Sequence, residues 1–155
     1  MASASASTGD ANQLGPWRDV LAHRTDSREA AEVRERFIVH GVSPEAVMAA
    51  LQDGGTQLAA AAASGRPDWS APFGGLLAAA LLAAEVSAHA SHLVERASVV
   101  RSVAVDGLLD DFSAIAVASE LGVSRQKVYE IARNSVQRRG KLPAMLRTPD
   151  VGARL

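Results

Sequence analysis

The chain has 155 residues, of which 48% are hydrophobic and 21% are charged, and its formal net charge is −1. This length fits one compact domain, or one small domain with an extra arm, and excludes a large multidomain enzyme. The absence of cysteine excludes disulfides, thiolate nucleophiles and cysteine-containing zinc or iron–sulfur sites, and it favours an intracellular protein.

Alanine dominates the composition. The chain contains 31 alanines, and only 4% of its residues are aromatic. A core of Ala, Leu and Val needs closely approaching backbones, which helices provide most easily. The composition therefore predicts an all-α fold. The succession of segments along the chain divides this fold into a helical N-terminal part and a C-terminal unit of three helices.

The first half of the chain divides into three predicted segments. The Ala/Ser-rich residues 1–14 are typical of a disordered tail. Residues 15–63 form an acidic helical part, in which Pro16 opens one helix, Asp26 begins a second with capping-box spacing, and Ser43 caps a third. Residues 64–72 hold two prolines and a glycine, which predicts a linker.

The second half begins with a strongly helical pattern that Gly107 ends at the latest. We expect this pattern to break near residues 89–91, so that a Leu/Ala helix over 73–90 forms a dimer interface; packing within one chain explains that helix equally well. A three-helix unit over 91–140 and a flexible basic tail over 141–155 follow. The longest uncharged stretch, 69–84, is too short for a membrane span, so none is predicted.

The near-neutral net charge hides an asymmetry between the two ends of the chain. Up to Phe112 the chain has 8 basic and 14 acidic residues, whereas the remainder has 8 basic and 3 acidic residues. A local positive field attracts polyanions even when the whole molecule is nearly neutral. The basic end therefore indicates a polyanionic partner.

The most informative stretch is Ala114-Ile-Ala-Val-Ala-Ser-Glu-Leu-Gly-Val-Ser-Arg-Gln-Lys-Val-Tyr-Glu-Ile-Ala-Arg133. It resembles the helix-turn-helix of bacterial DNA-binding regulators over about 20 residues. A small residue is needed where two short helices cross, and a glycine supplies the positive φ that reverses the chain. We expect apolar side chains, Val117 among them, to pack against the preceding helix around Leu93, Val100 and Val103. The residues predicted to build the motif are Ala118, Leu121, Gly122, Val123, Val128 and Ile131.

The opposite face of the second helix carries side chains suited to nucleic acid. Arginine pairs with guanine, glutamine with adenine, and glutamate accepts from cytosine, while tyrosine and lysine reach phosphates. The resemblance implies that this helix lies in the major groove, with Arg125, Gln126 and Tyr129 as the readers of base sequence. Glu130 or Arg133 could instead form a surface pair, and Arg138 and Arg139 could simply favour the end of their helix. The predicted DNA-binding residues are Ser113, Ser124, Arg125, Gln126, Lys127, Tyr129, Glu130, Arg133, Arg138 and Arg139.

Other groups of polar side chains in the sequence indicate a functional site less strongly. Glu85, His89 and His92 share a helix face, but Glu85 and His92 are about 10 Å apart along a straight helix, too far for one metal ion. His23 and His40 have no matching partner, and Asp110-Asp111 is interpreted as a cap for the next helix. Residues 37–47 imitate the turn of a helix-turn-helix, yet their acidic outer face favours protein packing. No enzyme, metal or cofactor is predicted.

These patterns predict a small bacterial transcription regulator that binds double-stranded DNA as a dimer in the cytoplasm, associated with the nucleoid. The acidic N-terminal helices are expected to serve dimerisation or a protein partner. Two alternatives stay open. One is a phage or plasmid DNA-binding protein, such as a terminase small subunit or a replication or partition factor. The other is an interaction module that contacts RNA polymerase or a sigma factor.

Overall fold

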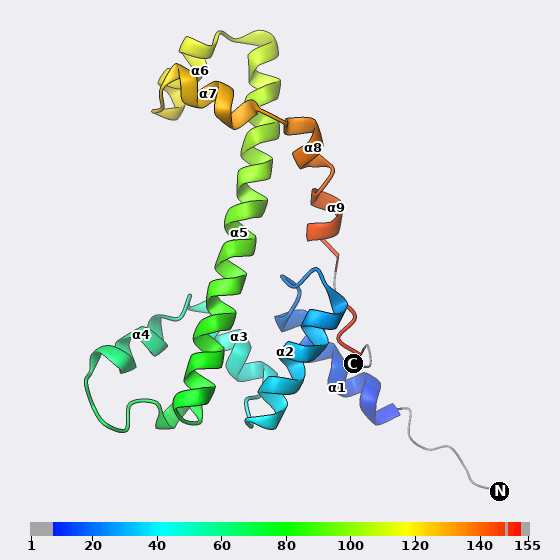
Figure 1. Ribbon diagram of the computed structural model, residues 1–155, viewed down its shortest axis with the longest axis vertical. Coiled ribbons are helices and arrows are strands. Elements are labelled where there is room, and N and C mark those ends of the chain that lie inside the picture. Colours follow the sequence, from blue (N-terminus) through cyan, green and yellow to red (C-terminus); the bar gives the residue numbers. More distant parts are fainter. Residues whose placement is uncertain (1–7, 148, 153–155) are drawn as a thin grey trace, which may run out of the picture. The chain divides into compact units, whose positions relative to one another are not determined.

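A computed structural model describes residues 8–147 and 149–152, with side chains from Leu14 onward (Figure 1). Every regular element in these ranges is helical and none is a strand, so the predicted all-α class is confirmed. The elements are α1 (Thr8–Val20), α2 (Ser27–Val39), α3 (Pro44–Gln52), α4 (Thr56–Ala63), the 3-10 helix η1 (Ala71–Phe73), α5 (Leu76–Asp111), α6 (Ala114–Leu121), α7 (Arg125–Ala132), α8 (Ser135–Arg139) and α9 (Leu142–Met145).

The chain forms two compact units, which differ from the predicted segments. The first unit comprises Met1–Ser91 and Arg147–Leu155, and the second comprises His92–Leu146. The division falls inside α5, whereas residues 64–72, the expected linker, lie within the first unit. Packing explains this difference, because Ser70 is buried and Trp69 and Phe73 pack against the first unit's core.

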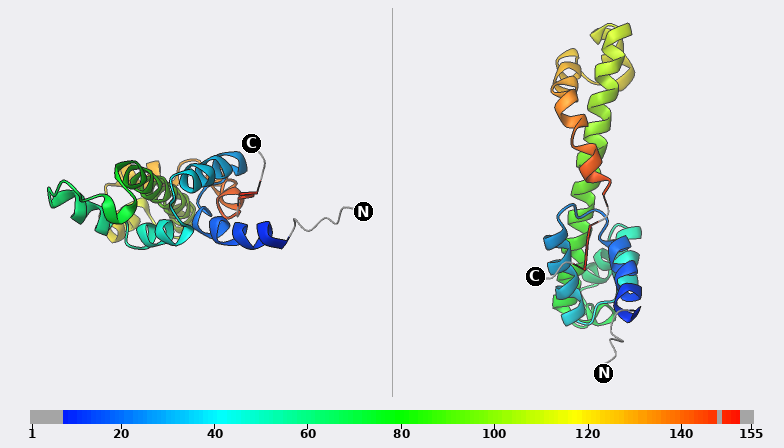
Figure 2. Two further views of the ribbon diagram at one scale, coloured as in Figure 1. Left: turned by 90° about the horizontal axis from the view of Figure 1, so that it is seen from below. Right: turned by 90° about the vertical axis from the view of Figure 1, so that its right-hand side faces the viewer.

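Buried side chains of α1, α2, α3, α4 and the first half of α5 form most of the core of the first unit. Figure 2 shows α1, α2 and α3 gathered around the beginning of α5. The Trp17 and Phe37 rings stack with their centroids 5.9 Å apart, and Leu21, Val47 and Leu82 are almost completely buried. The sequence predicted the starts of two of these helices correctly: Asp26 caps α2 and Ser43 caps α3, each accepting from a backbone N–H three residues on.

The first helix begins earlier than predicted. Residues 8–14, assigned to a disordered tail, form the first half of α1, and Pro16 lies inside that helix instead of opening it. Leu14 packs against the core, which gives the additional turns a tertiary contact. Residues 1–7 of the expected tail lie outside the described residues.

α5 is a single helix of 36 residues, so both the expected break near 89–91 and the expected end by Gly107 are wrong. The helix contains no proline, and one glycine costs a helix only about 1 kcal/mol relative to alanine, which tertiary packing readily offsets. In the described part of the chain, α5 alone is long and apolar enough, by length and composition, to cross a membrane. The sequence predicted no membrane span because the uncharged stretch 69–84 is too short. The helix itself is longer than that stretch, since it continues past Glu85 to Asp111.

A substitution at Gly107 tests directly whether α5 is helical through this position. Its backbone is helical and exposed, and a Cβ built there meets no other atom. Gly107→Ala should therefore raise the free energy of unfolding of the second unit by about 0.5 to 1 kcal/mol. Hydrogen exchange of amides in the second unit measures this change. No slowing of exchange, or faster exchange, would contradict a continuous helix at this position.

The C-terminal residues 141–155 are not the predicted flexible tail where the structure describes them. Residues 142–145 form α9, in which Met145 is buried, and Val151 is fully buried in the core of the first unit. Arg34 Nη1 donates a hydrogen bond to the Val151 carbonyl, and the Asp150 N–H donates to Ser27 Oγ at 3.0 Å. The basic composition of this segment did not predict that it packs against the first unit. The contact is made by the Val151 side chain and by two backbone groups, the Val151 carbonyl and the Asp150 N–H. Residues 148 and 153–155 lie outside the described residues.

Candidate functional site

The candidate site begins at the short connection between α5 and α6. Ser113 caps α6, with its Oγ accepting from the Ala116 N–H at 3.2 Å. Asp110 and Asp111 are the last two residues of α5, so the prediction that they cap the following helix is wrong. The serine takes that role because it follows the end of α5 in an extended conformation, as an N-cap requires.

The turn between α6 and α7 has the geometry that its sequence predicted. Gly122 ends α6 with φ +65°, and the Val123 N–H donates to the Ala118 carbonyl at 3.1 Å, which closes the helix end. Ser124 then caps α7 by accepting from the Lys127 N–H at 3.1 Å. Three local features therefore reverse the chain and start the second helix within three residues.

A small apolar core holds the second unit together. Its buried members are Val105, Ala114, Val117, Ala118, Val128 and Ile131. Leu109, Val123 and Ala132 are partly buried around them. Of the apolar residues predicted to lie inside, Val117, Val128 and Ile131 are buried and Val123 is partly buried, whereas Leu121 is 42% exposed.

The contribution of α5 to this core was predicted wrongly. The structure uses Val105 and Leu109, one helical turn apart, whereas Leu93 and Val100 are exposed and Val103 is only partly buried. The cause is the length of α5. Because the helix continues to Asp111, the turns beside α6 lie further along the chain than a helix ending at Gly107 would place them.

The outward face of α7 is polar and solvent-exposed. Val128 and Ile131 are buried on the inner face, which leaves Arg125, Gln126 and Tyr129 together on the outer one, with Tyr129 55% exposed. All six α7-face residues proposed for DNA are exposed; they are Arg125, Gln126, Lys127, Tyr129, Glu130 and Arg133.

One ion pair lies on this face. Lys127 Nζ is 3.3 Å from Glu130 Oε2, so Glu130 forms the surface pair that the sequence left open as its alternative role. Both side chains are about half exposed, and exposed pairs of this kind contribute little to stability. Lys127 can therefore exchange this partner for a phosphate at small cost.

The chain after α7 bends at Asn134, which has φ +61°. Ser135 Oγ then donates to Asp106 Oδ2 at 2.5 Å, which ties α8 to α5. Arg138 and Arg139 lie in the last turn of α8, where cations favour the negative end of a helix. Their position thus agrees with the helix-end alternative as well as with a phosphate contact.

The first unit contains a second turn of the same design. Gly41 has φ +68°, the Val42 N–H donates to the Phe37 carbonyl at 2.9 Å, and Ser43 caps α3. The position of Ala118 is here taken by Phe37, which is buried in the first unit's core. The inward packing of Phe37 agrees with the interpretation of residues 37–47 as a pair of packing helices. α3 carries Glu45 near its start, where α7 carries basic side chains.

A buried charged cluster in the first unit was not predicted. His23 Nε2 lies 2.5 Å from Glu85 Oε1, and Arg24 binds the same carboxylate through Nε at 3.1 Å and Nη2 at 2.8 Å. The His89 ring meets the His23 ring edge-on, with centroids 5.0 Å apart. The interpretation of His23 as a residue without a partner is therefore wrong. Its partner is 62 residues away, so no local pattern could reveal it.

The surroundings of Glu85 favour its charged form. Burial raises the pKa of this carboxyl, but the hydrogen bonds from His23 and Arg24 and the charge of Arg24 outweigh burial and hold the pKa below its ordinary value. The pKa of Arg24 is raised, chiefly by its hydrogen bond to Glu85. The cluster is thus an ion pair that joins the loop after α1 to the first half of α5.

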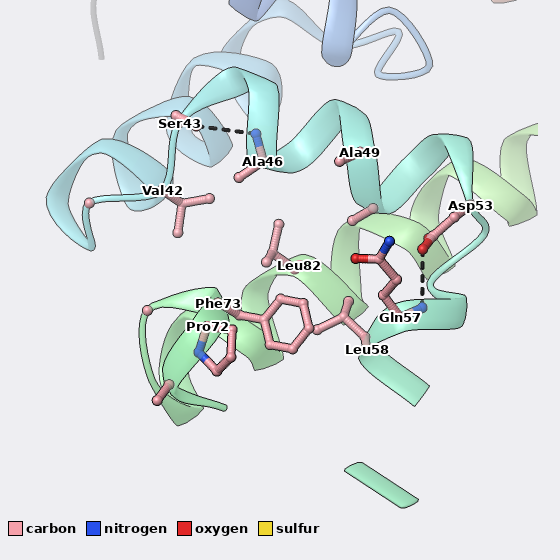
Figure 3. Close-up of a pocket in the computed structure, with 14 residues that line it drawn as sticks. Val42, Ser43, Ala46, Ala49, Asp53, Gln57, Leu58, Pro72, Phe73 and Leu82 are labelled. Atoms are coloured by element: carbon pink, nitrogen blue, oxygen red, sulfur yellow. Dashed lines mark hydrogen bonds between the residues drawn. The ribbon is translucent and has the colours of Figure 1, made fainter. Parts of the chain in front are cut away.

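The first unit also contains a cavity of about 480 Å³ between α3, α4, η1 and α5 (Figure 3). Its walls are mostly apolar, including Val42, Leu58, Phe73 and Leu82. The carboxylate of Asp53 at its edge already accepts from the N–H groups of Gly55 and Gln57. Among the described residues, no group of three His, Asp or Glu side chains could hold a metal ion.

Comparison with family models, with curated proteins and with solved structures found no match to this chain.

Proposed function

We propose that this protein binds double-stranded DNA through α6, the turn at Gly122 and α7, used as a helix-turn-helix with α7 in the major groove. The observation that carries this proposal is the two-sided character of α7. Val128 and Ile131 anchor one side in the core, while Arg125, Gln126 and Tyr129 are exposed together on the other. A helix presented in this way can enter a groove without unfolding its own unit.

The chemistry of the exposed face suits base pairs and phosphates. Arg125 can bind guanine O6 and N7, and Gln126 can bind adenine N6 and N7. Residues 125–146 hold six basic side chains and one acidic side chain, so a positive field surrounds these readers. Ser113 and Ser124 mark two helix N-termini, whose backbone N–H groups are natural phosphate donors.

A single helix of this kind reads only a few base pairs, so we propose that the protein acts as a dimer on two half-sites about one helical turn apart. The uncharged start of α5 supplies the proposed subunit contact. Leu76 and Leu77 are 67% and 55% exposed there, and Ala80, Ala83 and Ala84 beside them are exposed as well. The proposed role is that of a small bacterial transcription regulator in the cytoplasm, which acts by occupying its site on DNA.

The proposal is tested by selecting bound fragments from randomly sheared genomic DNA with the full chain. A DNA-binding regulator should enrich a small set of fragments that share a two-part sequence element. Fragments of random sequence, recovered at equal frequency with the wild type and with a chain that lacks the α7 readers, would contradict it.

Arg125 and Lys127 should have different effects on the selected duplex. Arg125→Ala should weaken binding by about 1 to 3 kcal/mol and relax the preference at one base pair, because this side chain is expected to contact a base edge. Lys127→Ala should weaken selected and random duplexes alike, because a phosphate contact carries no sequence information. Competition titrations with both duplexes measure the two effects. Equal losses on both duplexes for both variants would contradict this assignment of roles.

A further inference from the structure

We propose that an apolar groove in the second unit, between the end of α5 and α6, binds an amphipathic helix of a partner protein whose apolar side chains are flanked by lysine or arginine. The groove has a volume of about 340 Å³, and its walls are Leu108, Phe112, Ala116, Val117, Glu120 and Leu121. This proposal goes beyond DNA binding. The groove shares α6 with the proposed helix-turn-helix, but none of its wall residues is among the side chains proposed to contact DNA.

The groove exposes large side chains that a free surface rarely shows together. Phe112 is 57% exposed, and Leu108 and Leu121 are 40% and 42% exposed. Single exposed apolar residues are ordinary, but three large ones that line the same depression are typical of an interaction site.

The charges around the groove select the kind of partner. Residues 102–124 hold four acidic side chains and no basic one; they are Asp106, Asp110, Asp111 and Glu120. Glu120 lies in the groove wall itself, and Asp110 and Asp111 are exposed directly before Phe112. A partner that places apolar side chains in the groove therefore meets a negative rim, which favours cationic flanks.

The position of Asp110 and Asp111 at the end of α5 also favours a basic partner. The C-terminal end of a helix is its negative end, where carboxylates destabilise the helix and cations stabilise it. The last turn of α5 has these two carboxylates and no basic side chain. The free protein thus carries a local electrostatic conflict that a basic partner would relieve, and such conflicts are expected at functional sites.

A second copy of this chain fits the groove less well. A symmetric contact through this face would bring the same acidic side chains together. A stable dimer also needs about 800 Å² of surface from each partner, whereas this groove has room for only a few side chains. A helix that inserts apolar residues one turn apart needs only such a groove.

The test uses a fluorescent synthetic peptide of about 16 residues, with leucines one helical turn apart and lysines beside them, and a second peptide with glutamates in place of the lysines. Anisotropy titrations with the full chain should show binding of the basic peptide and at least tenfold weaker binding of the acidic one. Phe112→Ser with Leu108→Ser should weaken binding of the basic peptide at least tenfold, because both side chains line the groove. Val136→Ser, at an apolar position on α8 that is 79% exposed and lies outside the groove, should leave the affinity unchanged.

A double variant shows whether Asp110 and Asp111 attract the peptide or only affect the stability of the second unit. Asp110→Asn with Asp111→Asn should raise the thermal midpoint of unfolding and yet weaken the basic peptide several-fold, while binding of selected duplex DNA stays the same or strengthens. Unchanged peptide affinity in these variants would overturn the proposal, as would no binding of the basic peptide by the wild type. A sedimentation experiment completes the test. If Phe112→Ser with Leu108→Ser converts a dimer to a monomer, the groove holds a second copy and the proposal is wrong.

Discussion

Glu85→Gln is expected to lower the free energy of unfolding of the first unit by about 3 kcal/mol. Removing one partner from a buried ion pair leaves the other charge uncompensated, which costs about 3 to 5 kcal/mol in comparable cases. Glutamine keeps the shape of the side chain, so the loss comes from the charge that Arg24 and His23 contact. Urea titration followed by tryptophan fluorescence measures it, because Trp17 and Trp69 both lie in the first unit.

The control is Glu32→Gln. Glu32 pairs with Arg28 at the surface of α2 with its side chain 35% exposed, and such pairs contribute about 0 to 1 kcal/mol. The buried and exposed carboxylates should therefore differ clearly in their effects. Equal losses for the two variants would contradict the stabilising role of the buried cluster.

The contribution of Glu85 should depend on pH in a definite direction. Because folding lowers the pKa of Glu85, its stabilisation is fully present above the ordinary value of 4.5 and is lost as pH falls through the folded pKa. The difference in unfolding free energy between wild type and Glu85→Gln should thus shrink as the pH falls from 4.5 through the folded pKa. Urea titrations of both proteins across this range measure it. A difference that grows on acidification would show that the sign of the pKa shift is wrong.

Gly122→Val is expected to destabilise the second unit and abolish DNA binding. Gly122 has φ +65°, and a Cβ built there meets no atom within 4 Å, so the cost of a side chain at this position is chiefly conformational. A β-branched residue held in this region costs about 1 to 3 kcal/mol, which is a large share of the stability of a small unit. Hydrogen exchange of α6 and α7 amides and a titration with duplex DNA measure the two effects.

Gly122→Asn is the matched control, because asparagine tolerates positive φ far better than valine. It should preserve most of the protection and the affinity. The tryptophan transition of the first unit should be the same in both variants. If Gly122→Val bound DNA as the wild type does, the turn would not be what orients α7.

The sequence predicted the parts of this fold that local rules determine. Asp26, Ser43 and Ser124 cap helices because a short polar side chain in an extended residue reaches the N–H three residues on. Gly122 reverses the chain because other residues avoid its backbone conformation. Each of these features depends on fewer than six neighbouring residues, so the pattern alone was sufficient.

Contacts between distant residues explain what the sequence did not predict. His23 meets Glu85 only because the first unit folds, and Val151 is buried only because the chain returns to α2. α5 runs through its expected stop because packing of Val105 and Leu109 offsets the small cost of Gly107. In the candidate site, this continuation changed which α5 residues form the core, while Arg125, Gln126 and Tyr129 are exposed as the sequence suggested.

The central proposal is that α7 enters a groove of duplex DNA, and the salt dependence of binding tests it most directly. The full chain is titrated against a fluorescent selected duplex at several salt concentrations, and the logarithm of the affinity is plotted against the logarithm of the salt concentration. Each neutralised phosphate contributes about −0.9 to the slope, so a contact that uses several basic side chains of α7 and α8 predicts a slope steeper than about −2. Arg133→Ala should make it shallower by about one phosphate. A slope near zero, or no binding to any duplex at low salt, would contradict the proposal.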